Sequence, residues 1–105
     1  MMINEKNFKE EVLEAPVPVV ADFKADWCGT CRRLAPVVDR LEEEFAGKIK
    51  VVKVDVDESA GLADQVEVET LPTLYLFRDG QAISSVISPG SQDAIEEWLK
   101  ENQAL

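Results

Sequence analysis

The sequence predicts a single α/β domain built around one sheet. Short runs rich in β-branched residues alternate with segments of helical periodicity, which is the pattern of α/β proteins. Near the end of the chain, two such runs flank Asp79-Gly80, a strong β-hairpin signal. The length of 105 residues suits one core, so residues 1–105 are expected to form one domain.

The chain is expected to open with a short strand and a helix. Residues 1–3 leave space only for a stub of strand. A helix is predicted over residues 5–14, because Asn4 can cap its start and because Phe8 and Val12 lie on one face of it. These two apolar side chains should attach the helix to the core.

A mostly apolar run over residues 17–24 predicts a strand that is buried on both faces. This strand leads directly into Trp27-Cys28-Gly29-Thr30-Cys31. A long helix is predicted from Cys28 onward, with Gly47 placed where a helix commonly ends. Its apolar residues follow helical spacing, and they are Leu34, Val37, Val38, Leu41 and Phe45.

The rest of the chain continues the alternation and then forms the hairpin. We expect a strand over 49–55, a short helix over 59–65, strands over 73–77 and 82–87, and a last helix over 91–102. The order is therefore an alternation of helices and strands that ends in two consecutive strands and a helix.

Charge and hydropathy exclude several classes of partner. With 21 acidic and 11 basic residues the net charge is -10, which disfavours binding to nucleic acid and to anionic membranes. No apolar stretch is long enough to span a bilayer, and the first residues do not resemble a signal peptide. We therefore expect a cytoplasmic monomer that binds neither nucleic acid nor membrane.

The sharpest signal is the pair Cys28 and Cys31 at a strand-to-helix junction. On a helix the two sulfurs share a face, so they can form and break a disulfide with little backbone movement. Such a short loop would contribute only about 2 kcal/mol to stability, so stability is a poor reason for the pair. Backbone N–H groups at a helix start stabilise an anion, which makes Cys28 the expected nucleophile and Cys31 the resolving thiol.

Two other interpretations of the cysteine pair compete with this one. A zinc site needs about four ligands, and the chain has 2 cysteines and no histidine, so zinc would require a second subunit. Inert core cysteines are the other alternative, although Gly29-Thr30 between them is a poor core sequence. We expect no metal and no cofactor other than the Cys28–Cys31 disulfide itself.

Three segments together resemble the thioredoxin family: VADFKADWCGTCRRLAP, then VVKVDVDE, then LPTLYLFRDG. The resemblance covers nearly the whole chain. It implies a thioredoxin fold, with a central mixed five-stranded sheet flanked by four helices and a short first strand. It also implies a protein-disulfide reductase that acts by dithiol-disulfide exchange on disulfide-containing proteins and is recharged by a thioredoxin reductase.

The resemblance also implies roles for Asp22 and Lys53. Asp22 matches the family's buried aspartate, which moves the proton of the resolving cysteine through water. A carboxyl group inside an apolar strand should have a raised pKa, as a base working near neutral pH requires. The alternative is a surface aspartate that shares a strand face with Lys24. Lys53 matches the lysine that approaches this aspartate, and the alternative is an ordinary solvated strand lysine.

A docking rim around the cysteines is implied in the same way. Leu71-Pro72 matches the family's cis-proline loop, whose backbone pairs with extended substrate by strand addition. Trp27 precedes the nucleophile as in the family and should offer a contact surface, although a fully buried Trp27 would be simple core. Gly29 and Thr30 between the cysteines complete the predicted substrate-binding residues.

Three residues depart from the family pattern. Thr30 stands where proline is usual, and we expect it to shift the redox potential toward a more oxidising value. Lys24 replaces a second tryptophan, so it should either lower the pKa of Asp22 or add positive potential beside Cys28. Ser88 stands where glycine is common, which changes the third loop of the site.

Two rival functions remain open from the sequence. One is a net oxidant or isomerase-like variant of the same chemistry, which a measured redox potential would separate. The other is a redox-silent binding module that keeps the fold for protein interaction.

Overall fold

The computed structural model describes all residues 1–105, which fold around one five-stranded mixed sheet. The strands are β1 (Met2–Ile3), β2 (Val19–Lys24), β3 (Lys50–Asp55), β4 (Thr73–Arg78) and β5 (Gln81–Ile87). The helices are η1 (Lys9–Leu13), α1 (Gly29–Glu44), α2 (Ala60–Gln65) and α3 (Gln92–Glu101). The predicted five strands, four helices and short first strand are confirmed.

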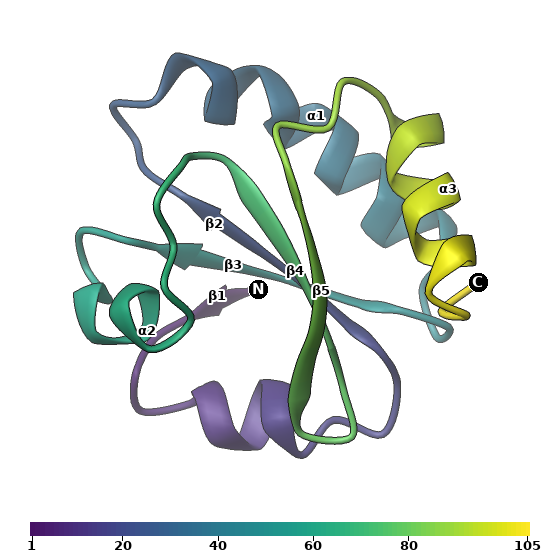
Figure 1. Cartoon of the computed structure of the whole chain (residues 1–105), viewed down its shortest axis with the longest axis horizontal. Helices are drawn as coiled ribbons and strands as arrows, with labels where there is room; N and C mark the ends of the chain where they lie inside the picture. The colour runs from purple at the N-terminus through teal and green to yellow at the C-terminus, as the bar shows by residue number, and fades with distance from the viewer.

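The strand order is β1-β3-β2-β4-β5, which places β2 at the centre. Strands β1, β3 and β2 run parallel, whereas β4 and β5 are antiparallel to their neighbours. Helices α1 and α3 cover one face of the sheet, and η1 and α2 lie on the other (Figure 1). None of these helices has the length and apolarity that crossing a membrane requires.

Strand β2 contributes residues to the cores on both faces of the sheet and also holds Asp22. Its residues from Val19 to Phe23 are all buried, because helices cover both faces of the sheet at its centre. Side chains alternate between the faces, so Val20 joins the core under α1 and α3, whereas Ala21 and Phe23 join the core under η1 and α2. Asp22 lies on the α1 face, where it is the strand's one buried charge.

The predicted first helix differs from the observed one. Asn4 caps it as expected, since its Oδ1 accepts from the backbone N–H groups of Lys6 and Asn7. The regular part is the π-helix η1, in which the N–H of Glu14 donates to the carbonyl of Lys9 at 2.9 Å. The predicted helix therefore forms within 5–14, but its regular part is shorter than predicted and is a π-helix. Spacing of apolar residues shows that a helix forms, but not which carbonyl closes each turn.

Two boundaries follow from backbone chemistry. Strand β2 begins at Val19, later than predicted, because Pro18 has no N–H to donate to a neighbouring strand. The hairpin turn is as predicted: Asp79 and Gly80 have φ of 52° and 78°, the left-handed pair that a tight two-residue turn requires. Gly47, after the end of α1, has φ of 88°, which fits its predicted place at the helix end.

Ser88 has φ of 44°, a left-handed conformation that costs a residue with a side chain roughly 1 kcal/mol. Its N–H donates to the Pro72 carbonyl at 2.9 Å, which holds it there. We therefore expect Ser88→Gly to raise the free energy of unfolding by about 0.5 kcal/mol, since the relieved strain exceeds the added freedom of the unfolded chain. Urea denaturation measures this. The control Ser85→Gly, inside β5, should lower the stability, and equal effects would contradict the strain.

Candidate active site

Cys28 is the N-cap of α1, at the point where the chain leaves β2. Its backbone is extended, with φ of -85° and ψ of 109°, so its side chain can turn back over the first helical turn. There the Cys28 sulfur accepts a hydrogen bond from the N–H of Cys31 at 3.2 Å. This is the place that serine or aspartate takes in ordinary helix caps. Cys28 is 8% exposed.

Cys31 lies one turn inside α1 and is 4% exposed. Burial raises the pKa of its thiol to about 11, and a hydrogen bond to the Cys28 sulfur adds to the effect. At neutral pH Cys31 is therefore protonated, and it needs a base before it can act as a nucleophile. The two cysteines are chemically unequal, as the helix geometry predicts.

Asp22 lines the same cavity as Cys31 and is 3% exposed. Burial raises the pKa of its carboxyl group from 3.8 to about 6, and the positive charges of Lys53 and Lys24 oppose that rise without cancelling it. Its Oδ1 is buried and has no hydrogen-bond partner in the protein. The expectation of a buried carboxyl group with a raised pKa is confirmed, and the alternative of a surface aspartate was wrong.

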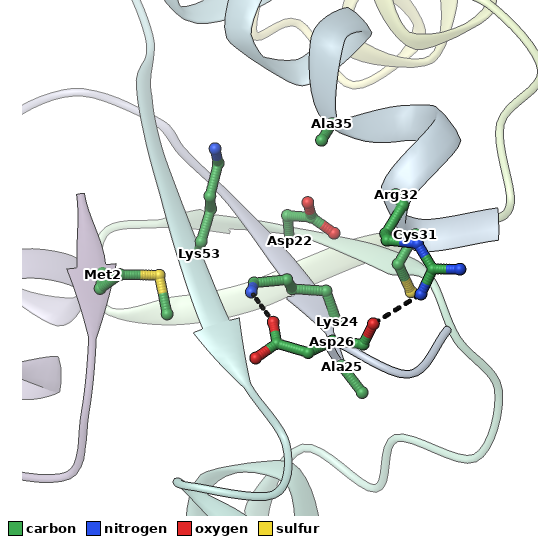
Figure 2. Close-up of a pocket in the computed structure, with 9 residues that line it drawn as sticks. All are labelled: Met2, Asp22, Lys24, Ala25, Asp26, Cys31, Arg32, Ala35 and Lys53. Atoms are coloured by element: carbon green, nitrogen blue, oxygen red, sulfur yellow. Dashed lines mark hydrogen bonds and ion pairs between the residues drawn. The ribbon is translucent and has the colours of Figure 1, made fainter. Parts of the chain in front are cut away.

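A cavity of about 430 Å³ joins the carboxyl group to the resolving cysteine. Figure 2 shows Asp22 between Lys53 and Cys31, with Lys24 nearby; all four residues line the cavity. The space is large enough for several water molecules, at about 30 Å³ each. An unpartnered carboxylate oxygen, a protonated thiol and room for water are the components of a proton relay.

Lys53 does approach Asp22, but its ammonium binds elsewhere. The two residues are register partners on β3 and β2, and the Lys53 charge is the largest influence that lowers the Asp22 pKa. The Lys53 Nζ, however, lies 2.8 Å from the carboxylate of Asp39 on α1. Lys53 thus ties the helix to the sheet while it moderates Asp22 from a distance.

Lys24 is held in a similar way, by Asp26 at 3.1 Å. Its charge lowers the pKa of Asp22, which supports the first of the two effects expected of this departure from the family pattern. Lys24→Met keeps the side chain at a similar length but removes its positive charge. We expect this variant to raise the pKa of Asp22 above about 6. Carboxyl NMR titration measures this change. Lys48→Met, in the exposed turn after α1, is the control, and an unchanged Asp22 in Lys24→Met would contradict the coupling.

Trp27 stands at the rim of the site and is 68% exposed. Its indole Nε1 donates to the carboxylate of Asp57 at 2.8 Å, which fixes the ring while leaving its surface open. A groove of about 460 Å³ runs from Trp27 and Cys28 to Leu71. The alternative that Trp27 is simple core was therefore wrong, and the ring is available to a partner.

The Leu71-Pro72 bond is cis, as the resemblance implied and the base rate of such bonds did not. Leu71 lines the Trp27 groove, and Pro72 lines a second groove of about 290 Å³ that includes Thr30 and Arg33. Thr30 is exposed, and its hydroxyl accepts from Arg33 at 3.2 Å. Gly29 lies between the two cysteines at the helix start. Trp27 and Leu71 thus share a groove with Cys28, and Thr30 and Pro72 share the second groove.

Sequence reasoning missed three carboxylates that shape the site: Asp26, Asp39 and Asp57. Each pairs with a predicted site residue or its neighbour, namely Lys24, Lys53 or Trp27. Asp39 could have been found from its position two turns after Cys31 on the same helix, which brings it over β3. The other two carry no local signal, because their partners depend on how the loops after β2 and β3 turn.

Comparison with known proteins agrees with this geometry. The Thioredoxin family model matches residues 1–101. The chain is 41% identical over 100 residues to Thioredoxin 1 of a Nostoc species, covering 95% of this chain and 94% of that one. It is 44% identical over 98 residues to Thioredoxin of a Synechocystis species, covering 93% and 92% of the two chains. It is 33% identical over 100 residues to Thioredoxin of Rickettsia felis, covering 95% of each.

These matches extend over the whole fold and include the segment that holds both cysteines. The Cys28 sulfur caps the helix, and the buried, protonated thiol of Cys31 lies one turn away, in the same cavity as the Asp22 carboxyl group. This arrangement suits dithiol-disulfide exchange. The chain belongs to the thioredoxin family, as a thiol-disulfide oxidoreductase that reduces protein disulfides.

Proposed function

We propose that Cys28 and Cys31 reduce protein disulfides in two exchange steps assisted by Asp22. In the first, the Cys28 thiolate attacks one sulfur of the substrate disulfide, forms a mixed disulfide and releases the other sulfur as a thiolate. In the second, Cys31 loses its proton and attacks the Cys28 sulfur, which frees the second substrate thiolate. The substrate gains two electrons, and the protein is left with a Cys28–Cys31 disulfide.

The role of Asp22 rests on its pKa and on the cavity it shares with Cys31. A base with a pKa of about 6 is ionised at neutral pH and still binds a proton readily. It can therefore accept the proton of Cys31 through water in the second step and return it when the pair is reduced again. Lys53 and Lys24 keep the pKa of Asp22 from rising beyond this useful range.

The rim residues support docking of an extended substrate segment. Trp27 offers an exposed ring on one side of Cys28, and Gly29 and Thr30 border it on the helix side. The backbone before Pro72 would pair with the segment as an added strand, which binds without demanding one sequence. Electrons would return from a thioredoxin reductase. Because all of these groups come from one chain, we propose that a monomer acts, and a reducing cytoplasm would keep the pair as a dithiol.

The single observation that carries this proposal is the Cys28 sulfur as N-cap acceptor beside a protonated Cys31. Reduction of insulin by dithiothreitol tests it, since precipitation of the insulin B chain follows cleavage of the interchain disulfides. Catalytic amounts of the protein should shorten the lag several-fold. An unchanged lag would contradict reductase activity and favour a redox-silent binding module. A measured redox potential separates a reductase from a net oxidant.

A further inference from the structure

Arg32 and Arg33 lie in the first part of α1, next to the two cysteines. Lys24, Lys50 and Lys53 each pair with a carboxylate. Neither arginine forms an ion pair: Arg32 donates to the Asp26 backbone carbonyl at 2.7 Å, and Arg33 donates to the Thr30 hydroxyl at 3.2 Å.

Both guanidinium groups fold back over the first turn of α1, beside Gly29 between the two cysteines. A Cβ built on Gly29 would lie 3.5 Å from Arg33 Nη1 and 3.8 Å from Arg32 Nη2. Two delocalised positive charges therefore flank the residue that follows the nucleophile. Both side chains are exposed, so a docking partner can reach them.

Arg32 and Arg33 lie near the N-terminus of α1, where positive charge lowers the stability of a helix. The start of a helix carries partial positive charge, where acidic residues stabilise and cations destabilise by about 0.3 to 1 kcal/mol each. The first turn of α1 holds no acidic residue at all. No acidic side chain of this first turn offsets the positive charge, so a negatively charged group of a partner would be stabilised there.

The carboxylate of Asp26, whose backbone carbonyl accepts from Arg32, is turned away from Arg32. Figure 2 shows Asp26 between two cations, with its backbone carbonyl toward Arg32 and its carboxylate toward Lys24. Lys24 thereby occupies the carboxylate that could otherwise neutralise Arg32. This gives the Lys24–Asp26 pair a second consequence beside its effect on Asp22.

We propose that Arg32 and Arg33 select protein substrates that carry an acidic side chain beside the disulfide cysteine, an inference that rests on the function proposed above. A segment crossing Cys28 would pass Gly29, beside which both guanidinium groups lie. Arg33 also lines the groove that includes Thr30 and Pro72, whereas Arg32 lines the cavity of Asp22 and Cys31. Glu69 lines the groove on the other side of Cys28, so the two sides of the site differ in charge. Guanidinium groups bind carboxylates through two parallel hydrogen bonds, which suits this task.

The net charge of -10 does not override this local preference. At physiological salt, charges are screened beyond about 8 Å, so acidic residues on distant helices act weakly on a docked segment. The two arginines lie beside Gly29, the residue after Cys28, and so would lie close to a segment docked there. The nearby arginines therefore outweigh the distant acidic residues, and the interaction with an acidic segment is attractive.

The test uses a peptide disulfide in three versions, with Glu, Gln or Lys on both sides of the same cysteine. The rate constant for reduction by the pre-reduced protein is measured for each. Wild type should reduce the Glu peptide about 10-fold faster than the Lys peptide. In the double variant R32Q/R33Q the Glu peptide should slow by about 5-fold and the Gln peptide by less than about 2-fold. High salt should weaken the wild-type preference.

Arg40→Gln is the matched control, because it removes the same charge from an exposed position farther along α1. It should leave the preference intact. A wild type that treats the three peptides alike, an equal loss on the Glu and Gln peptides, or an equal loss in Arg40→Gln would overturn the inference. Failure of wild type to reduce even the Gln peptide would instead overturn the proposed function.

Discussion

Replacing Asp22 with Asn should raise the free energy of unfolding at pH 8 by about 3 kcal/mol, at about 1.4 kcal/mol for each tenfold change in proton affinity. The reason is that burial raises the pKa of this carboxyl group from 3.8 to about 6. Above pH 6 the folded protein holds a buried carboxylate that the unfolded chain would hydrate freely. Asn has nearly the same shape and carries no charge.

The pH dependence follows from the direction of the shift. Between pH 3.8 and about 6 the unfolded chain has lost the Asp22 proton while the folded protein still keeps it. As the pH rises from 3.8 to about 6, the stability of the wild type therefore falls relative to that of the variant. Above about pH 6 the difference between the two proteins stays constant. Below pH 3.8 both forms of wild type are protonated, and the two proteins should differ little.

Urea denaturation at several pH values from 3.5 to 8 measures the difference in stability. Asp64→Asn, at an exposed position of α2, is the control and should change stability by less than about 0.5 kcal/mol at any pH. A gain that stays constant from acid to alkaline pH would show that the carboxyl charge is not its source.

The Asp22→Asn variant should also slow substrate release about 100-fold, because Cys31 loses its base.

Replacing Cys31 with Ser should stop the reaction after its first step. The Cys28 sulfur still attacks the substrate, but nothing resolves the mixed disulfide, so the covalent complex accumulates. Replacing Cys28 with Ser should lower reduction by at least about 1,000-fold, because the remaining Cys31 has a thiol pKa of about 11 and little thiolate at pH 7. The two variants therefore differ in kind as well as in rate.

Nonreducing gels of cell extract incubated with each variant measure the trapped complexes. Cys31→Ser should form bands that dithiothreitol removes, and the proteins in them identify the substrates. The double variant without either cysteine is the control for noncovalent binding. Equal trapping by Cys28→Ser and Cys31→Ser would contradict the assigned roles.

Local chemistry made much of this protein predictable from its sequence. The order of strands and helices follows from apolar spacing, and the hairpin follows from Asp79-Gly80 because left-handed backbone favours those residues. Asp22 stands out because it interrupts an apolar strand, and a central strand buries whatever it contains. Cys28 stands out because a helix begins just after it.

Features that depend on long-range packing were not predictable in the same way. Lys53 was expected near Asp22, but the rotation of α1 over β3 decides that Asp39 binds its ammonium. The cis Leu71-Pro72 bond is opposite to the statistical expectation and came only from the family resemblance. The fold of Arg32 and Arg33 over Gly29 depends on side-chain directions that no spacing rule provides.

Competitive alkylation of the reduced protein tests the central inequality between the two sulfurs most directly. A trace of iodoacetamide at pH 7, followed by mass spectrometry of the peptides, gives the two labelling rates in one sample. We expect Cys28 to react at least about 100-fold faster than Cys31, because the thiol pKa of Cys31 is about 11 and little of it is ionised at pH 7. Comparable rates for the two sulfurs, or faster labelling of Cys31, would contradict the roles assigned to them.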